Sequence, residues 1–454
     1  MQINVLRENP LRKYYIKTFG CQMNVYDSHR IASMLNNLGF EETKTAQKAD
    51  LIILNTCHIR EKAAEKVFSD LGRLKMIKDE RAKEGLDTVI GVVGCVVQAE
   101  DEEVFRRVPF IDFATGPLTY YRLPEILRKV GEKRGEPIID TEFPAESKFD
   151  FLPQNSSMGG SSFLAIQEGC DNFCTYCIVP YTRGVETSRP VNDIIEEARI
   201  LVAEGSVEIN LLGQNVNSYR GTDASGKERN LAYLLRKIAE IDGLDRIRYT
   251  TSYPADVDDD LIECHRDILK LMPYLHLPVQ SGSDKILKAM NRRHTSGEYL
   301  DKITRLKEAR SDLQFSSDFI VGFPGESDKD FEDTLGLVRK VEFCQAFSFK
   351  YSRRAGTPAA IMPNQVEEKV KKERLEILQK LLAEYQLRFN KESIGKIMPV
   401  LFDIKGRHKG ELIGRTPYMQ NVHAELGKEY CNKIVNVRVT GANVNSLAGV
   451  KEGK

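Results

Sequence analysis

Residues 168–177 read Glu-Gly-Cys-Asp-Asn-Phe-Cys-Thr-Tyr-Cys, and this run places Cys170, Cys174 and Cys177 within one short loop. A tetrahedral structural zinc site needs a fourth ligand nearby, usually from a second Cys-x-x-Cys pair. The next cysteine along the chain is Cys264, so such a site would be one ligand short. Three thiolates suit a four-iron cluster better, because they hold three irons and leave the fourth open to a small molecule. The alternative, three cysteines packed in a core, is disfavoured by the segments around them.

The loop follows the first of six predicted strands. That strand is 163–167, and the other five apolar candidates lie at 207–212, 246–251, 274–279, 314–321 and 344–351. Helix-like segments such as 191–204 separate most of them. Six strands with intervening helices predict a partial (β/α)6 barrel over residues 156–385, with its active site at the carboxyl ends of the strands.

Toward the N-terminus, three further strands alternate with helices, and each runs into a cysteine. Residues 14–18 run into Cys21, 51–54 into Cys57, and 89–93 into Cys95. Continuous apolar strands alternating with helices indicate a parallel α/β sheet covered on both faces, here over residues 12–130. Ligands of such sheets lie beyond the carboxyl ends of the strands. A single cysteine at a strand end is more often a small core residue, but three in register predict a second iron–sulfur cluster, again with one open iron.

The remaining segments are a connection and a small all-β region. Residues 131–155 carry several prolines and glycines and are predicted to be an interdomain linker. Residues 386–452 contain short strand candidates at 398–404, 411–414, 420–424 and 434–440, which predict a small β-barrel. Between residues 385 and 454 there are 12 Lys and Arg against 6 Asp and Glu. This basic end is the predicted nucleic-acid surface, with a merely solvated basic face as the alternative.

The composition of the whole chain limits its expected partners and cellular compartment. Lys plus Arg and Asp plus Glu both number 66, so the overall charge gives no evidence for an acidic partner. The longest apolar run, near 89–97, is short and broken by glycine, and the first eleven residues lack the apolar core of a signal peptide. We therefore expect a cytoplasmic protein without membrane association. Nine cysteines in a reducing compartment favour metal or catalytic roles over disulfides.

With these motifs in view, the chain resembles a methylthiotransferase of the radical S-adenosylmethionine (SAM) superfamily over nearly its whole length. The CxxxCxxC run resembles the superfamily signature, and the C-terminal region resembles the small RNA-binding β-barrel called TRAM. The segments 177–190 and 212–219 resemble the MiaB branch, the tRNA-2-methylthio-N6-dimethylallyladenosine synthases. One departure is that the glycine-rich motif of the fifth strand begins with Asp318.

The resemblance implies methylthiolation of carbon 2 of N6-isopentenyladenosine beside the anticodon of tRNA. Two molecules of SAM would be used, one as methyl donor and one as radical source, with the sulfur taken from the second cluster. The two [4Fe-4S] clusters would be held by Cys170, Cys174 and Cys177 and by Cys21, Cys57 and Cys95. A reductase such as a flavodoxin or ferredoxin, and iron–sulfur assembly proteins, are the expected partners of a monomeric enzyme.

Residues near the strand ends are the expected contacts of SAM and substrate. For SAM they are Tyr176, Gln214, Asn215, Gln280, Ser281, Gly282 and Gly322, since amides and hydroxyls can hold its ribose and methionine parts and glycines admit its adenine. Taken alone, the glycines after the fifth strand are ordinary turn chemistry. For the substrate they are Arg183, Glu186 and Arg189, with structural ion pairs as the alternative, and Arg407, Lys409 and Arg415 on the basic barrel.

Other functions are open at this point. The same chemistry acting on a ribosomal-protein aspartate, or on threonylcarbamoyl-adenosine in tRNA, is the nearest alternative. A non-catalytic iron–sulfur RNA-binding module is a different class of protein, and the intact SAM-type cysteine motif argues against it.

Overall fold

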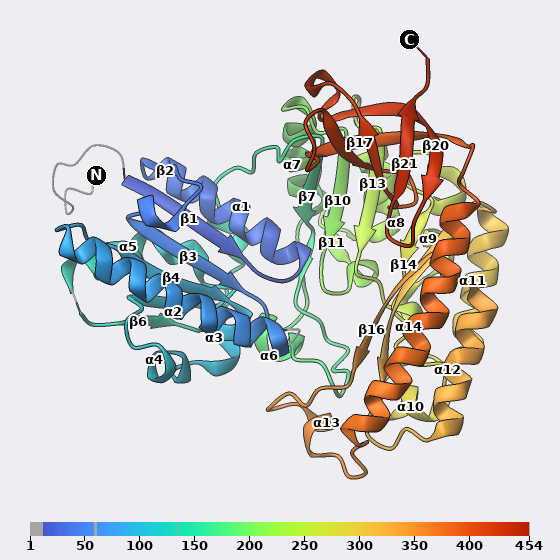
Figure 1. The fold of residues 1–454 in the computed structure, drawn as a ribbon, viewed down its shortest axis with the longest axis horizontal. Helices are drawn as coiled ribbons and strands as arrows, with labels where there is room; N and C mark the ends of the chain where they lie inside the picture. Colours follow the sequence, from blue (N-terminus) through green and yellow to red (C-terminus); the bar gives the residue numbers. More distant parts are fainter. Residues whose placement is uncertain (1–11, 59–60, 134, 454) are drawn as a thin grey trace. The chain divides into compact units, whose positions relative to one another are not determined.

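The computed structural model of the chain describes residues 12–58, 61–133 and 135–453 (Figure 1). These residues form two units. The first unit holds the described residues up to Asn155 together with 168–171 and 178–187, and the second holds 156–167, 172–177 and the described residues from Ser188 onward.

A six-stranded parallel sheet forms the centre of the first unit. Its spatial order is β2-β1-β3-β4-β5-β6. The three predicted strands are β1 (Arg12–Thr18), β3 (Leu51–Thr56) and β4 (Val89–Gly94). Three short strands extend the sheet, namely β2 (Phe40–Glu42), β5 (Phe113–Thr115) and β6 (Ile138–Asp140). The parallel α/β sheet predicted for this region is confirmed, with three more strands than expected.

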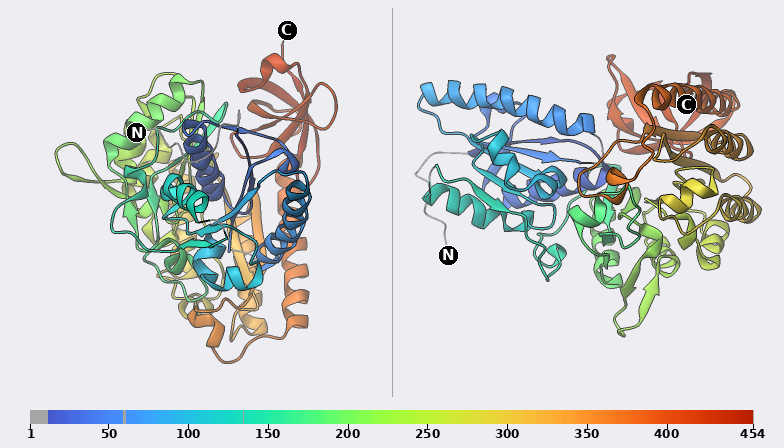
Figure 2. Two further views of the ribbon diagram at one scale, coloured as in Figure 1. Left: turned by 90° about the vertical axis from the view of Figure 1, so that its left-hand side faces the viewer. Right: turned by 90° about the horizontal axis from the view of Figure 1, so that it is seen from below.

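Helices cover both faces of this sheet, as the two views of Figure 2 show. They are α1 (Gln22–Asn37), α2 (Glu61–Lys83), α3 (Cys95–Glu100), α4 (Glu103–Arg107) and α5 (Leu123–Glu132). Buried side chains of α2, α3 and α4 form one apolar cluster with one face of the sheet, and those of α1 and α5 form another with the opposite face. β3 and β4 are buried on both faces, which agrees with the apolar runs at residues 51–54 and 89–93.

The described residues between 131 and 155, predicted to be a linker, group with the first unit. Ile138 and Ile139 of β6 pair with β5 and extend the sheet. Lys148 lies in a 3₁₀ turn and has only 3% of its surface exposed. The prolines and glycines interrupt regular structure here, but β6 still pairs with the sheet and Lys148 is still buried.

Six parallel strands in two three-stranded sheets open the second unit. Their orders are β13-β10-β7 and β14-β15-β16, and a parallel bridge between Ile247 and Leu271 joins the two sheets. The predicted partial barrel is confirmed, with strand bounds within three residues of those expected. The strands are β7 (Ser161–Ala165), β10 (Glu208–Leu212), β13 (Arg246–Thr250), β14 (Tyr274–His276), β15 (Gln314–Val321) and β16 (Gln345–Lys350).

Helices alternate with these strands and bury their apolar faces in one core. Thr295 and Ser327 start two of them through capping boxes with Glu298 and Asp330, which pair backbone N–H groups of the first turn. The helices are α7 (Val191–Ala203), α8 (Leu231–Ala239), α9 (Asp259–Asp267), α10 (Asp284–Ala289), α11 (Ser296–Ala309), α12 (Asp328–Val341) and α13 (Pro358–Ile361). Two short strands of the second unit are β11 (Arg220–Thr222) and β12 (Glu228–Asn230). The helix α6 (Val179–Arg183) belongs to the first unit, and β8 (Gln167–Glu168) and β9 (Thr187–Ser188) each have one residue in either unit.

A long helix, α14 (Glu368–Lys391), leads into a closed five-stranded barrel of order β17-β18-β19-β21-β20, which confirms the predicted all-β module. The helix runs across the predicted boundary at residue 385. The barrel strands are β17 (Ile397–Lys405), β18 (Glu411–Arg415), β19 (Asn421–Glu425), β20 (Lys433–Ala442) and β21 (Leu447–Lys451). Sequence reasoning missed β21 because Gly449 interrupts its apolar pattern, although a Cβ there would lie 2.3 Å from Val437 Cγ1. No helix among the described residues is long and apolar enough to cross a membrane.

Two buried arginines fasten this C-terminal barrel to the amino-terminal ends of β10 and β13. Arg246 and Arg248 each donate two hydrogen bonds to backbone carbonyls of the barrel, at 2.6–3.1 Å. The Glu208 carboxylate lies 2.9 Å from Arg248 Nε and 3.8 Å from Arg246 Nη1. Burial by itself raises the pKa of Glu208, but the charges of Arg248 and Arg246 outweigh it and lower the pKa to about 2.

Replacing Glu208 by Gln should lower the free energy of unfolding by about 3–5 kcal/mol, because two buried arginines lose their counter-charge. Since the folded-state pKa lies below the usual value, this contribution is complete above about pH 4.5 and is lost as the pH falls toward about 2. Urea titrations between pH 3 and 7 measure it. The control is Glu263→Gln, which breaks an exposed pair with Arg236 and should cost less than about 1 kcal/mol. Equal losses in the two variants would contradict the role of Glu208.

Candidate functional site

Three cysteines meet at the carboxyl edge of the sheet in the first unit. Cys21 follows β1 and caps α1, Cys57 follows β3, and Cys95 follows β4 and opens α3. The Cys57 side chain is close enough to Cys21 to lower its pKa, and Cys95 is close enough to Cys21 for their charges to interact. The structure therefore places all three cysteines at the strand-end edge that the register predicted, with Cys21 near the other two.

Gly20 makes this close approach possible. Its φ of +103° lies in the region that glycine adopts without strain. A Cβ at this position would lie 2.1 Å from Cys57 Cβ and 2.6 Å from Cys57 Sγ. Any larger residue would therefore have to displace Cys57.

Asn24 ties the strand ends that carry these cysteines. Its Nδ2 donates to the carbonyls of Phe19 and Thr56 at 2.9 and 2.8 Å. Its Oδ1 accepts from Cys21 Sγ at 3.6 Å. Because Asn24 is fully buried, these bonds pair backbone groups that no water could reach, and they hold the ends of β1 and β3 at a fixed spacing.

Four buried charges lie behind this cysteine edge, and we call Asp27, Lys148, Glu168 and Arg183 the four-charge cluster. Lys148 Nζ lies 3.0 Å from Asp27 and 2.7 Å from Glu168. Arg183 lies 2.8 Å from Asp27 and 2.5 Å from Glu168. None of the four side chains is more than 5% exposed. Each cation contacts both carboxylates, so the charges are balanced within the protein.

The arginines expected to touch substrate have structural partners instead. Arg183 belongs to the four-charge cluster, and Arg189 is buried and pairs with Glu197 at 2.6 Å. Glu186 is half-buried, and its backbone N–H donates to Asp171 at 3.1 Å. These ion pairs agree with the structural alternative for both arginines, and their contact with substrate stays a prediction.

The electrostatics of the first cysteine set differ between Cys21 and Cys95, and a lowered pKa favours the thiolate form that metals bind. The hydrogen bond with Cys57 lowers the pKa of Cys21 most, burial opposes it, and the charge of Arg183 lowers it further, to about 6. Burial raises the pKa of Cys95, although Arg183 acts against it. Among the described residues, no three or more His, Cys, Asp or Glu side chains are arranged to hold a single metal ion. The role of these cysteines as cluster ligands stays a prediction.

The second cysteine set lies on the loop after β8. Cys170 folds with the first unit and its N–H donates to the Gly184 carbonyl at 3.3 Å, while Cys174 and Cys177 fold with the second unit. The Cys177 N–H donates to the Cys174 carbonyl at 2.9 Å. Thr175 anchors this part of the loop, since its N–H and hydroxyl donate to carbonyls at the end of α10, at 3.0 and 2.9 Å.

Arg292 contacts one of these cysteines, and sequence reasoning missed it. Its Nη1 lies 3.7 Å from Cys174 Sγ, and its guanidinium carbon lies 4.2 Å from the ring centre of Tyr253. Its Nη2 donates to the Pro278 carbonyl just beyond β14. The available signal was the pair of adjacent arginines, Arg292 and Arg293, in the loop before α11. Their distance from the cysteine motif along the chain concealed the contact.

Two buried polar atoms at the carboxyl ends of β10 and β13 have no hydrogen-bond partner among the described residues. They are Asn215 Oδ1 and Ser252 Oγ. Asn215 is held in place because its Nδ2 donates to Asp256 at 2.8 Å. Buried polar atoms are rarely left unpaired in proteins, so this edge fits a polar ligand such as SAM. Gln214 is half-buried, and its backbone N–H donates to Gln167.

Three residues expected to contact SAM are packed against helices instead. Ser281 is fully buried, and the Gly282 N–H donates to Thr334 of α12 at 3.0 Å. A Cβ on Gly282 would lie 2.5 Å from the Asp333 carbonyl oxygen, and one on Gly322 would lie 2.3 Å from Lys371 Cγ. The close passage of α12 and α14 therefore explains these glycines and Ser281. Contact of these three residues with SAM stays a prediction.

Two other predicted SAM contacts lie near the fifth strand. Tyr176 makes an edge-to-face contact with Phe323 at 6.5 Å between ring centres, next to the glycine-rich motif. Gln280 has a φ of +76°, and its backbone bridges to β15 through Asp318 and Ile320. Both positions are compatible with the expectation, and their contact with SAM stays a prediction.

The basic residues of the C-terminal barrel divide into two kinds. Arg407 and Lys409 lie exposed in the turn between β17 and β18. Arg415 forms an ion pair with Asp403 and is only 22% exposed. It also contributes to the charge around Glu208. Arg407 and Lys409 are therefore available to a phosphate backbone, whereas Arg415 is engaged within the protein.

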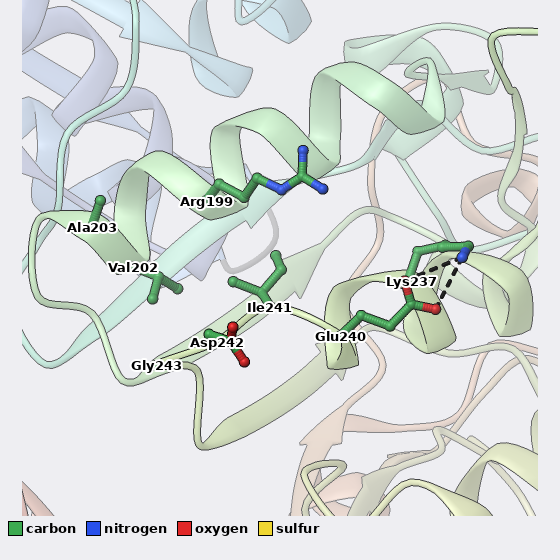
Figure 3. Close-up of a pocket in the computed structure, with 8 residues that line it drawn as sticks. All are labelled: Arg199, Val202, Ala203, Lys237, Glu240, Ile241, Asp242 and Gly243. Atoms are coloured by element: carbon green, nitrogen blue, oxygen red, sulfur yellow. Dashed lines mark hydrogen bonds and ion pairs between the residues drawn. The ribbon is translucent and has the colours of Figure 1, made fainter.

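A surface hollow of about 540 Å³ lies at the carboxyl ends of α7 and α8 (Figure 3). Arg199 of α7 and Lys237 of α8 line it, and Lys237 is paired with Glu240 at 2.9 Å. Its lining contains no cysteine, and none of the predicted site residues. It is therefore separate from the candidate site.

Comparisons with known proteins show which families the chain resembles. The model of the Uncharacterized protein family UPF0004 matches residues 13–116, and that of the Radical SAM superfamily matches residues 164–338. A protein of Agrobacterium fabrum (strain C58) named tRNA-2-methylthio-N(6)-dimethylallyladenosine synthase is 55% identical over 441 residues, which cover 96% of each chain.

Solved structures show the same fold at low sequence identity. The radical SAM methyltransferase TsrM from Kitasatospora setae, with tryptophan substrate and aza-SAM bound, has a TM-score of 0.56 at 12% identity and covers 77% of this chain and 75% of its own. The cobalamin-dependent SAM radical enzyme OxsB has a TM-score of 0.50 at 14% identity and covers 82% of this chain and 56% of its own.

The identity to the Agrobacterium protein extends across both units and the C-terminal barrel. It includes the family-model regions that hold both cysteine sets. The chain therefore belongs to the family of tRNA-2-methylthio-N6-dimethylallyladenosine synthases, within the radical SAM superfamily.

Proposed function

We propose that this protein adds a methylthio group to carbon 2 of N6-isopentenyladenosine next to the anticodon of tRNA. The observation that carries the proposal is the meeting of Cys21, Cys57 and Cys95 in a chain that also has the CxxxCxxC loop. The Agrobacterium relative is named for synthesis of the corresponding nucleoside in tRNA. The same chemistry on a ribosomal-protein aspartate, or on threonylcarbamoyl-adenosine, is not favoured.

Each cysteine set would hold one [4Fe-4S] cluster with one open iron. When bound, the clusters and SAM supply the electron, the radical and the sulfur that an unreactive aromatic carbon requires and side chains cannot provide. The protein's own residues hold and orient these groups. Asn24 fixes the spacing of the first set, Arg292 places a positive charge beside Cys174, and Asn215 and Ser252 present unpaired polar atoms to SAM.

In this proposal the target base of tRNA binds at the strand-end edge, and the phosphates of tRNA bind to the C-terminal β-barrel. A base that is to react must leave its stack, and anticodon loops expose single-stranded bases that proteins can bind in this way. Arg407 and Lys409 would bind phosphates. A flavodoxin or ferredoxin reductase, iron–sulfur assembly proteins, a cytoplasmic location and a monomeric state complete the proposal.

Nucleoside analysis of tRNA from cells that lack this protein tests the proposed function. The expected result is loss of the 2-methylthio derivative with accumulation of N6-isopentenyladenosine, and recovery when the gene is restored. Unchanged nucleosides, or loss of a methylthiolated ribosomal aspartate instead, would contradict it.

Replacing Arg407 and Lys409 together by Ser should lower the slope of log affinity for tRNA against log salt by about 1.4–1.8, since each phosphate contact contributes about 0.7–0.9. Cleavage of SAM without tRNA should be unchanged. The control is Arg438→Ser on the same barrel, because Glu452 already balances that charge at 2.6 Å. Filter binding at several salt concentrations measures the slopes. Equal slopes in wild type and the double variant would remove tRNA binding from this turn.

A further inference from the structure

The four-charge cluster joins the flanks of one cysteine set to the edge that carries the other. Glu168 lies two residues before Cys170, and Arg183 lies six residues after Cys177. Asp27 lies on α1, the helix that Cys21 caps. The helix α6, which ends at Arg183, packs against α3, which begins at Cys95.

Arg183 is the cation of the cluster that reaches the cysteine edge. Its Nη2 lies 3.2 Å from Asn24 Oδ1, the oxygen that also accepts from Cys21 Sγ at 3.6 Å. Lys148, the other cation, has its remaining contacts elsewhere, with the Pro117 carbonyl at 3.2 Å and the Tyr120 ring at 4.8 Å. The positive charge nearest to Cys21 within this cluster therefore comes from Arg183.

We propose that Arg183 is a positioning residue whose fixed positive charge raises the reduction potential of the cluster held by Cys21, Cys57 and Cys95. The proposal rests on the proposed function, which places a cluster there. Reduction adds one negative charge, and a guanidinium at its side stabilises that charge strongly because the site is buried and of low dielectric. Arginine does not lose its proton in proteins, so the effect is constant with pH.

A purely structural role for Arg183 makes a different prediction. Pairing with Asp27 and Glu168 stabilises the fold whether or not the cluster is reduced, so it would leave the potential unchanged. A positioning role appears as a shift of potential that depends on charge. Lysine at this position keeps the charge, whereas glutamine removes it.

The test uses protein in which Cys170, Cys174 and Cys177 are replaced by Ala, so that one cluster is loaded. Dithionite supplies the electron, and the paramagnetic signal of the reduced cluster is followed during a redox titration. Arg183→Gln should leave about tenfold less reduced cluster at a fixed potential, a shift of about 59 mV for one electron. Arg183→Lys should stay close to the parent. Arg81→Gln is the matched control, because Arg81 is a buried arginine of the same unit that pairs with Asp50.

The outcomes separate this inference from the proposed function and from misfolding. If the protein with Cys170, Cys174 and Cys177 replaced by Ala holds no iron, the proposed cluster at the other three cysteines does not exist. If Arg183→Gln does not fold, the pair Glu168→Gln and Glu168→Gln/Arg183→Gln compares the same charge loss without an unpaired Glu168 carboxylate. A lower potential in the double variant than in Glu168→Gln supports the role. Iron-loaded Arg183→Gln, or the double variant, with an unchanged potential would overturn it.

Discussion

A variant in which Cys21, Cys57 and Cys95 are replaced by Ala should still cleave SAM but should form no methylthiolated nucleoside. Cleavage depends on the loop set, whereas the sulfur in our account depends on the strand-end set. The iron content should fall from about eight to about four per chain, since each cluster contains four irons. Quantification of 5′-deoxyadenosine and of tRNA nucleosides by mass spectrometry measures the two activities separately.

The reciprocal variant has Cys170, Cys174 and Cys177 replaced by Ala. It should lose SAM cleavage, because those cysteines hold the cluster that binds SAM, and it should keep about four irons. Cys264→Ala is the control for removal of a cysteine, since Cys264 is a core residue whose thiol donates a hydrogen bond to the Ala232 carbonyl. Methylthiolated nucleoside made by the first triple variant would contradict the sulfur role of the strand-end set.

Replacing Gly20 by Ala should remove the cluster held by Cys21, Cys57 and Cys95, although none of these cysteines is changed. The new Cβ would overlap Cys57 Cβ at 2.1 Å, and the φ of +103° is strained for any residue with a Cβ. Iron content should therefore fall toward about four per chain, with loss of methylthiolation and retention of SAM cleavage.

Gly39→Ala is the matched control for this change. Gly39 has a φ of +83°, and a Cβ added there would have no atom within 4 Å. It bears the same kind of backbone cost, roughly 1–2 kcal/mol for the left-handed region, without an overlap. Full iron content in Gly20→Ala would show that the approach of Cys57 to β1 is not required.

The strands are predictable where an apolar run is long enough to be distinctive. β3 and β4 are buried on both faces and contain apolar runs at residues 51–54 and 89–93. β5 and β6 have three residues each, and no pattern of that length separates a strand from a loop. This is why the sequence of residues 131–155 predicts a linker. β5 and β6 join the sheet through pairing with strands that are distant along the chain.

The cysteine sets are predictable because spacing and strand register express their geometry. The residues that pack around the cysteine sets are not predictable from the sequence, since their contacts depend on how distant segments of the chain fold against one another. Gly282 and Gly322 lie against α12 and α14, and the sequence around a glycine does not show whether a helix or a ligand approaches it. Arg183 likewise follows the cysteine loop as a surface substrate contact would, but its burial with Asp27 is visible only in the fold.

The most direct measurement of the central claim uses purified, reconstituted protein with SAM that carries a deuterated methyl group. It is incubated anaerobically with reductant and tRNA that contains N6-isopentenyladenosine, and the nucleosides are analysed by mass spectrometry. The account predicts a 2-methylthio nucleoside that is heavier by the three deuterons of one methyl group, and none from tRNA without the isopentenyl modification. SAM cleavage without any methylthiolated nucleoside, or equal modification of both tRNAs, would contradict it.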